Sequence, residues 1–292
     1  MLKGQHVRMN RLKLHNGVTQ IELESKPFSL LQVEQWHDGL SEEKQDCLAE
    51  ETPVAIVYNG VSHAVMLATA EDLEDFALGF SLSEEILSDA NELYGVEVNI
   101  RHNGIELHCE ISSERFAQLK ERRRTLAGKT GCGLCGAENL AQAMRYPKPI
   151  SVNHTFASKR ILLGLQAIKT QQALQQKTGA THASAYVLAD GTIALLREDV
   201  GRHNALDKLV GALAKSTLDK TGFILTTSRA SFEMVQKTAT AGVGMLVAVS
   251  APTGLAVRVA KVCGLALVGF ARENRYVVYS HPALIQHESI KT

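Results

Sequence analysis

The sequence is poor in cysteine and proline and has no excess of charge of one sign. It has five cysteines and six prolines in 292 residues, and 31 Lys and Arg balance 31 Asp and Glu. An odd cysteine count at irregular spacing excludes the disulfide framework of a small secreted protein. A formal net charge of zero argues against a protein that coats nucleic acid, because such binding needs a broad cationic surface. It leaves room for a local basic pocket that takes one small anion.

Long apolar runs are also missing. The longest, such as residues 262–271, are too short to span a bilayer. Residues 1–17 mix basic and polar side chains without an apolar centre, so no signal peptide is predicted. We therefore expect a cytoplasmic protein with no membrane segment, in a reducing compartment where thiols serve packing, metal binding or catalysis.

The first half of the chain divides into three segments. Residues 1–50 have weak periodicity and are predicted to be a partly flexible N-terminal extension. Residues 51–125 are predicted to form a smaller β-rich subdomain, with two hairpins that each turn at Asn-Gly. Between the hairpins, a helix is expected, with Thr69 as a suitable N-cap. Residues 126–150 are predicted to be a Gly-rich Cys-x-x-Cys loop and a Pro-marked junction.

Residues 151–292 have a clearer periodicity of apolar and polar residues. Helix and strand patterns alternate along them, at 157–177, 185–188, 192–196, 203–215, 223–227, 232–241, 245–249, 254–264 and 266–270. Such alternation predicts a mixed sheet covered by helices on both faces. The predicted fold class is therefore α/β (α+β with a mixed sheet), with this larger C-terminal domain beside a smaller β-rich N-terminal domain.

A Cys-x-x-Cys pair flanked by four glycines is the sharpest local motif. Cys132 and Cys135 lie within Gly128–Gly136, where glycine lets the backbone move at low steric cost. Three arginines at 122–124 would favour the nucleophilic thiolate. Four interpretations stay open: a persulfide-carrying nucleophile, half of a zinc site, a thioredoxin-like redox pair or a structural loop. The other three cysteines are predicted to pack as small apolar groups: Cys47, Cys109 and Cys263.

Charged residues crowd three junctions in the second half. The densest is Arg197–Lys208, which has more charged groups than helix capping alone needs. Residues 226–231 place hydroxyls and Arg229 at a helix N-terminus, an arrangement that suits an anion. Phe270–Arg275 ends a strand with two arginines. Capping and ordinary surface arginines are the plain alternatives, and the loop residue His182 carries no specific signal.

Taken in order, these segments resemble the formate dehydrogenase accessory sulfurtransferase family, FdhD. The resemblance runs from about Glu51 to His281, and its most specific motif is the Arg197–Lys208 block. Further matching segments are Pro53–Gly60, Glu74–Glu84, Gly131–Gly136, Ser228–Val235, Ser250–Thr253 and Gly264–Arg272.

The resemblance implies a sulfur carrier. Members of this family take persulfide sulfur from a cysteine desulfurase. They transfer it to the molybdenum cofactor, in its bis-molybdopterin guanine dinucleotide form, before the cofactor enters the catalytic subunit of formate dehydrogenase. By this resemblance the chain is a sulfurtransferase in which Cys132 carries the persulfide and Cys135 assists. The resemblance also implies a cytidine-deaminase-like C-terminal domain and a homodimer.

The cofactor would bind near the C-terminal end, at the family segment formed by Phe270, Ala271, Arg272, Glu273, Asn274 and Arg275. From the residues themselves, Arg202 and Arg229 offer fork-shaped donors to phosphates, as do Arg272 and Arg275. His203 lies beside Arg202, and Asp199 or Asp207 would accept from a guanine edge. Guanine nucleotide is expected to mimic the cofactor.

Two other functions remain alternatives, a non-catalytic chaperone for the molybdenum cofactor and a zinc-binding module. Deamination is not expected, because His182-Ala183-Ser184 lacks the Glu of the deaminase His-x-Glu motif.

Overall fold

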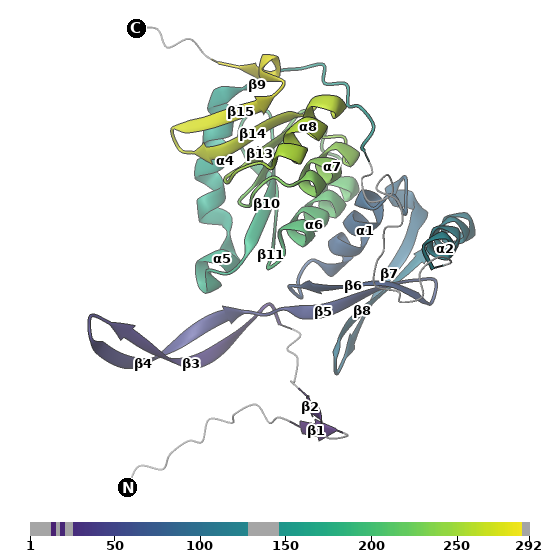
Figure 1. Ribbon diagram of the computed structural model, residues 1–292, viewed down its shortest axis with the longest axis vertical. Coiled ribbons are helices and arrows are strands. Elements are labelled where there is room, and N and C mark those ends of the chain that lie inside the picture. The colour runs from purple at the N-terminus through teal and green to yellow at the C-terminus, as the bar shows by residue number, and fades with distance from the viewer. Residues whose placement is uncertain (1–12, 16–17, 21–25, 128–145, 288–292) are drawn as a thin grey trace.

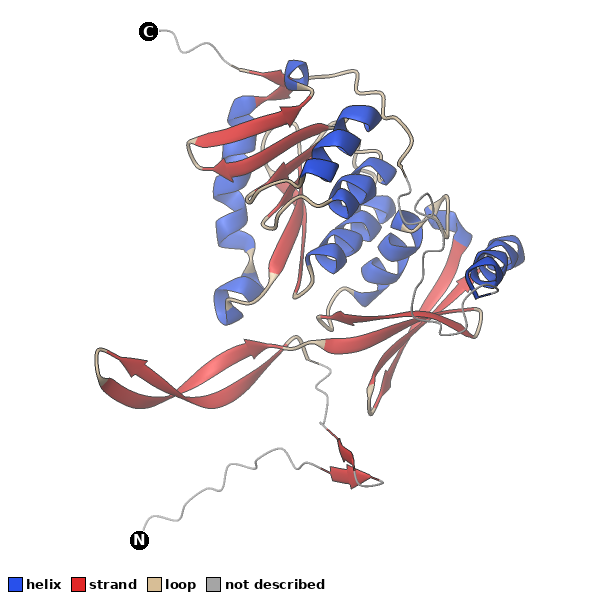
Figure 2. Cartoon of the chain, in the orientation of Figure 1, coloured by secondary structure: helices blue, strands red, loops and turns tan. Residues whose placement is uncertain are grey.

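The computed structural model describes residues 13–15, 18–20, 26–127 and 146–287 (Figure 1). Two sheets dominate the fold, a six-stranded sheet in the C-terminal domain and a four-stranded sheet in the N-terminal domain (Figure 2). Among the helices of these residues, none is long and apolar enough to cross a membrane. Cys132 and Cys135 lie outside the described residues.

The N-terminal sheet has the strand order β6-β5-β8-β7. Both predicted hairpins form, and β5 and β8 pair in parallel at the centre. Asn59 and Gly60 have positive φ, as a type I′ hairpin turn requires. The strands are β5 (Thr52–Tyr58), β6 (Val61–Ala68), β7 (Leu93–Arg101) and β8 (Gly104–Ile111).

Helix α1 (Leu73–Ser83) packs its apolar side on one face of this sheet. Its N-cap residue is Asp72, with a left-handed backbone, so the prediction that Thr69 caps it was wrong. Thr69 is fully buried and instead accepts a hydrogen bond on Oγ1 from the amide of Val200 at 3.1 Å. A second helix, α2 (Ser113–Ala127), was not predicted.

The C-terminal sheet has the order β11-β10-β12-β13-β14-β15. Strands β12, β13 and β14 are parallel and the other pairs are antiparallel, which confirms the predicted mixed sheet. The last strand was not predicted. The strands are β10 (His182–Val187), β11 (Ile193–Asp199), β12 (Phe223–Thr226), β13 (Met245–Ala248), β14 (Ala266–Arg272) and β15 (Arg275–Ser280).

Helices cover both faces of this sheet, as Figure 2 shows. One face packs on α4 (Ser158–Gln171), which ends at Gln172 and is followed by α5 (Ala173–Thr178). The predicted single helix over 157–177 is therefore two. The other face packs on α6 (Arg202–Lys215), α7 (Phe232–Thr240) and α8 (Gly254–Cys263). Short elements complete the described chain: β1 (Lys13–His15), β2 (Val18–Gln20), η1 (Ala90–Glu92), β9 (Phe156–Ala157), η2 (Pro282–Leu284) and β16 (Ile285–Gln286).

The two domains are joined by close packing of α1 against α6. A Cβ atom added to Gly79 would lie 1.7 Å from the carbonyl oxygen of Asp207, and one added to Gly211 would lie 2.0 Å from that of Asp75. No side chain fits at either position, so the two glycines let the helix backbones touch. This contact fixes how the N-terminal domain sits on the C-terminal one.

A long hairpin precedes the N-terminal sheet and extends away from the body (Figure 1). It consists of β3 (Phe28–His37) and β4 (Leu40–Ala49), whose side chains are mostly exposed. The sequence of these residues predicts no regular element, because their apolar side chains do not alternate with polar ones along one face.

Two of the three cysteines described are core residues. Cys109 is 2% exposed and Cys263 is 1% exposed, which confirms that they pack as apolar groups. Cys47 is half-buried on β4. Burial raises the pKa of the Cys109 thiol to about 12 and raises that of Cys263 as well, so both stay neutral thiols near pH 7.

Candidate functional site

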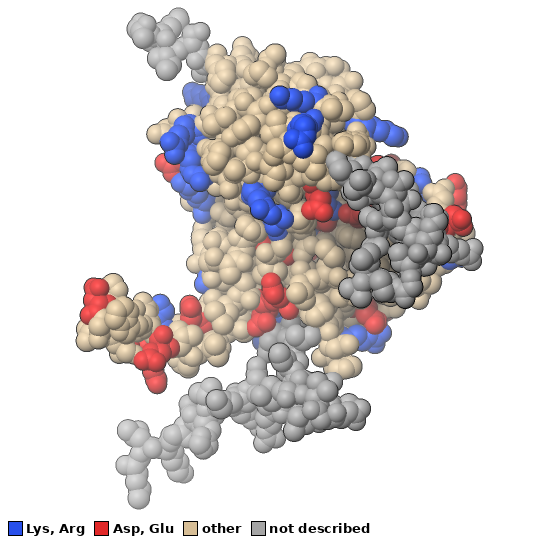
Figure 3. Space-filling view, viewed as in Figure 1, with Lys and Arg blue, Asp and Glu red and all other residues tan. Residues whose placement is uncertain are grey.

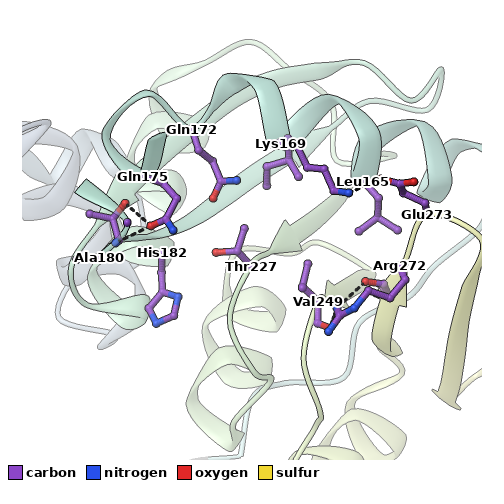
Figure 4. A pocket seen from close by; sticks show the side chains of 14 residues that line it. Leu165, Lys169, Gln172, Gln175, Ala180, His182, Thr227, Val249, Arg272 and Glu273 are labelled. Atoms are coloured by element: carbon purple, nitrogen blue, oxygen red, sulfur yellow. Dashed lines mark hydrogen bonds and ion pairs between the residues drawn. The ribbon is translucent and has the colours of Figure 1, made fainter. Parts of the chain in front are cut away.

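A cavity of about 690 Å³ opens where the three parallel strands of the C-terminal sheet end. Its floor comes from Thr227 after β12, Val249 after β13 and Ala271 at the end of β14, and its wall comes from α4 and α5 (Figure 4). Ligands of open α/β sheets bind at the carboxyl ends of parallel strands. The volume is within the range of small-molecule sites.

Arg272 is the main cationic group of this cavity. Its Nη1 donates to the carbonyl oxygens of Val249 and of Ala271, the latter at 3.1 Å. These bonds hold the Nη1 end of an exposed guanidinium in place. A guanidinium has five N–H donors in all, so other donors remain for an anion. Lys169 and Glu273 form an ion pair beside it, and Figure 4 shows both among the lining residues.

His182 occupies the other end of the cavity, with Thr227 between it and Arg272 (Figure 4). Burial, and secondarily the positive charge of Arg202, lowers the pKa of this histidine below its ordinary 6.5. The imidazole is therefore neutral at pH 7, able to donate one hydrogen bond from one ring nitrogen and accept one at the other. This neutral, half-buried ring is a functional candidate that the sequence did not single out.

The titration of His182 is expected to show the influence of Arg202. In Arg202→Gln the pKa of His182 should rise part of the way towards 6.5, because burial is the larger cause and remains. The unfolded chain binds the proton more readily, so His182 favours folding less as the pH falls below 6.5. Proton–carbon NMR of the ring during a pH titration measures this shift.

The control is Arg229→Gln, an exposed arginine after β12 that should leave the pKa of His182 unchanged. A His182 pKa that does not move in Arg202→Gln, or that moves equally in both variants, contradicts the assignment.

Arg202 and His203 begin helix α6. The Nε2 of His203 lies 2.7 Å from Oε2 of Glu233 and 3.4 Å from the hydroxyl of Ser231, and this pair connects the N-termini of α6 and α7. The hydrogen bond from His203 lowers the pKa of Glu233. The Nε of Arg202 is buried and has no hydrogen-bond partner in the described part of the chain.

Asp199 has protein partners on both carboxylate oxygens. It is 0% exposed, and its charged partner is Lys208 Nζ at 2.7 Å, itself 0% exposed. The amides of Thr69 and Gly201 donate to it at 2.9 Å and 2.7 Å, and Asn204 Nδ2 donates at 3.0 Å. The predicted contact of Asp199 with a guanine stays a prediction, but the structure shows this carboxylate enclosed by the protein.

The rest of the Arg197–Lys208 block also turns inward. Most of its charged and amide side chains reach other segments, which explains their density without a ligand. Their partners are Asp75 for Arg197, the amides of Leu174 and Gln175 for Glu198, the carbonyl of Leu67 for Asn204, Ser83 and Lys237 for Asp207, and the carbonyl of Thr69 for Lys208.

The structure brings together only part of the predicted cofactor site. Ala271, Arg272 and Glu273 line the cavity with His182 and Thr227. The other predicted residues are outside its lining: Phe270 on β14, Asn274 in the β14–β15 turn, Arg275 at the start of β15, and Asp199, Arg202, His203 and Arg229. Lys169, Gln172 and Gln175 also line the cavity and were not predicted, because the polar side of a helix has the same sequence pattern whether it faces water or a cavity.

The described part of the chain has no group of three or more His, Cys, Asp or Glu side chains that could hold a metal ion. The Cys-x-x-Cys pair, on which the zinc alternative depends, lies outside that part.

Comparison with known proteins identifies the family. The model of the FdhD/NarQ family matches residues 49–286. A protein of Cupriavidus necator named "Sulfur carrier protein FdhD" is 54% identical over 269 residues, which cover 92% of this chain and 93% of that protein. A Bordetella petrii protein of the same name is 53% identical over 240 residues, 82% of this chain and 86% of that protein.

A solved structure has the same fold. It is a crystal structure of a protein from Desulfotalea psychrophila described as a formate dehydrogenase accessory protein, with a TM-score of 0.71 at 22% identity over 89% of this chain and 99% of that chain. The family model spans most of the sequence, and the relatives exceed half identity over more than four-fifths of it. This chain therefore belongs to the FdhD/NarQ family.

Proposed function

We propose that this protein is a sulfur carrier that takes persulfide sulfur from a cysteine desulfurase. The sulfur is transferred to the molybdenum cofactor, in its bis-molybdopterin guanine dinucleotide form, before the cofactor is inserted into formate dehydrogenase. The observation that carries this proposal is the high identity to relatives named sulfur carriers. The Gly-flanked pair Cys132 and Cys135 supplies the chemistry.

The proposed chemistry has two steps at this pair. The Cys132 thiolate attacks the outer sulfur of the donor's persulfide. The donor's sulfur–sulfur bond breaks, the donor leaves as a thiolate, and Cys132 becomes a persulfide. The Cys135 thiolate then attacks the inner sulfur of Cys132. A disulfide forms, the outer sulfur leaves as hydrosulfide for the cofactor, and a thiol reductant restores the pair.

The cavity beside Arg272 supports binding of the anionic cofactor. Donors from Arg272, Thr227 and the neutral His182 face one space that is large enough for a nucleotide portion. Arginine forks suit phosphate oxygens, and Arg202 and Arg229 follow strands at the same edge of the sheet. A guanine nucleotide is the proposed mimic of the cofactor here.

Mass spectrometry of the full chain tests sulfur carriage. After incubation with a cysteine desulfurase and cysteine, the peptide that contains Cys132 should gain the mass of one sulfur atom, and a reductant should remove it. The adduct should persist in Cys135→Ala and disappear in Cys132→Ala.

Two results would favour the alternatives. Binding of guanine nucleotide without any sulfur adduct supports a non-catalytic chaperone. Stoichiometric zinc that is lost only when both cysteines are replaced supports a zinc-binding module.

A further inference from the structure

Two glutamine side chains border the α5 end of the cavity. Gln172 lies at the break between α4 and α5, and Gln175 is in the first turn of α5. Both line the cavity, and Figure 4 shows them extending toward Thr227 and His182. This end of the cavity therefore offers neutral amide groups to a ligand.

The carboxamide of Gln175 has a fixed orientation. Its Oε1 accepts a hydrogen bond from the backbone amide of Thr181 at 2.8 Å, and the Thr181 hydroxyl lies 3.3 Å from the same oxygen. Because this oxygen already has partners, the group left for a ligand is Nε2, which has no acceptor among the described residues. An amide nitrogen only donates, so this position requires an acceptor from the ligand.

Glu198 of β11 holds this arrangement in place. Its buried carboxylate accepts from the backbone amides of Leu174 and Gln175, each at 2.8 Å, and lies 3.1 Å from the Thr181 hydroxyl. These contacts cap the first turn of α5 and fix Thr181, which in turn fixes the amide of Gln175. A carboxylate already occupies this helix end, so it does not suit a phosphate.

Gln172 is buried, yet its carboxamide has no partner. The residue is 9% exposed, and no described residue forms a hydrogen bond with its side chain. A buried polar group without a hydrogen bond costs free energy, and a ligand in the cavity would remove that cost. Since neither its oxygen nor its nitrogen is engaged, this amide can turn to accept or to donate.

Positive charge lies at the opposite end of the cavity. Arg272 ends β14, and Lys169 of α4 is paired with Glu273 beside it. Figure 3 shows basic side chains along this α4 edge of the C-terminal domain. A bound nucleotide would therefore place its phosphates beside Arg272 and its base at the α5 end.

We propose that Gln175 is the specificity-determining residue of this cavity and selects a ring carbonyl that is next to a ring N–H. Guanine has this edge: its O6 accepts from Gln175 Nε2, and its N1–H donates to Gln172 Oε1. Adenine has an amino group in place of O6, so donors would face donors and stay unpaired. The inference rests on the proposed cofactor role of the cavity. It gives the guanine contact to glutamines rather than to Asp199 or Asp207, whose carboxylates bond within the protein.

Isothermal titration calorimetry of the full chain with GDP and with ADP tests this assignment. The unchanged protein should bind GDP about 10- to 100-fold more tightly than ADP. Gln175→Glu keeps the oxygen that accepts from Thr181 and replaces the donor by a second acceptor, so the two dissociation constants should become about equal. The added negative charge repels both diphosphates alike, so the ratio of the two constants isolates the contact with the base.

The matched control is Gln171→Glu, which adds the same charge on an exposed residue of α4 outside the cavity lining. It should keep the preference for GDP. Gln172→Met should weaken both nucleotides by roughly three- to tenfold and leave their ratio unchanged, because the amide of Gln172 can turn to meet either ring. Equal thermal midpoints and retained ADP binding should show that Gln175→Glu folds.

Three results would overturn this inference alone. They are equal affinity of the unchanged protein for GDP and ADP, a preference for GDP that survives Gln175→Glu, and tighter binding of a pterin carboxylate, which has the same ring edge, than of GDP. A chain that binds neither nucleotide overturns the cofactor cavity and this inference with it. Sulfur carriage on Cys132 is measured separately by mass and does not depend on these affinities.

Discussion

Formate dehydrogenase activity is expected to fall to the level of a strain without this protein when Cys132→Ala is the only copy supplied. The reason is that alanine has no thiolate to accept the sulfur. Without this loading step, no sulfur reaches the cofactor. Cys135→Ala should retain a small but measurable part of the activity, because Cys132 can still be loaded and a thiol reductant can attack its inner sulfur in place of Cys135. The assay is formate oxidation in extracts of a deletion strain, with equal protein levels shown by immunoblot.

The structure already excludes two of the other cysteines as the residue that carries the sulfur. Cys109 and Cys263 are buried neutral thiols, and neither can attack a partner's persulfide. Cys47 is the matched control, since it is half-buried on the hairpin, and Cys47→Ala should keep full activity. If Cys132→Ala supports activity equal to Cys47→Ala, the protein does not carry sulfur on Cys132, and the chaperone alternative is favoured.

Replacement of Lys208 by methionine is expected to destabilise the protein by about 3–5 kcal/mol. The methionine fills a similar volume, but it leaves the carboxylate of Asp199 buried without its cation. Both side chains are 0% exposed, so water cannot take the place of the ammonium group. Urea unfolding followed by circular dichroism measures the change in free energy of unfolding.

Two further variants separate the effect of an unpaired buried charge on the free energy of unfolding from the effect of lost packing. Lys215→Met removes a half-exposed lysine that is paired with Asp75 and should cost less than about 1 kcal/mol. Asp199→Asn/Lys208→Met removes both charges and should recover part of the stability lost in Lys208→Met. If Lys208→Met costs no more than Lys215→Met, the Asp199–Lys208 pair does not contribute the stability expected of a buried ion pair.

Local patterns predicted most of the secondary structure, because each depends on near neighbours in sequence. The Asn59-Gly60 turn, the alternation of β12, α7, β13 and α8, and the mixed sheet all followed from periodicity and turn residues. The start of α1 was misplaced. Thr69 has the chemistry of a cap, but in the structure it bonds to Val200, far along the chain, which no local pattern reveals.

The Arg197–Lys208 block shows the same limit at the candidate site. Its charged side chains indicated a ligand, yet Arg197 and Asp207 reach α1 and Asp199 pairs with Lys208. A high density of charged residues in a sequence does not show whether those residues bind a ligand or another part of the protein. Either partner can form the same hydrogen bonds with them. Conversely, His182 carried no signal, and its low pKa comes from burial and from Arg202.

The sequence by itself determined the family, the Cys-x-x-Cys pair and most of the order of helices and strands, because motifs, turns and periodicity depend on neighbouring residues. Only the tertiary structure decided which charged groups are structural and which face the cavity, and it alone showed the exposed hairpin. These depend on burial and on contacts between residues more than a hundred positions apart, such as Asp75 with Arg197. Such contacts exist only once α1 and α6 have packed together at Gly79 and Gly211.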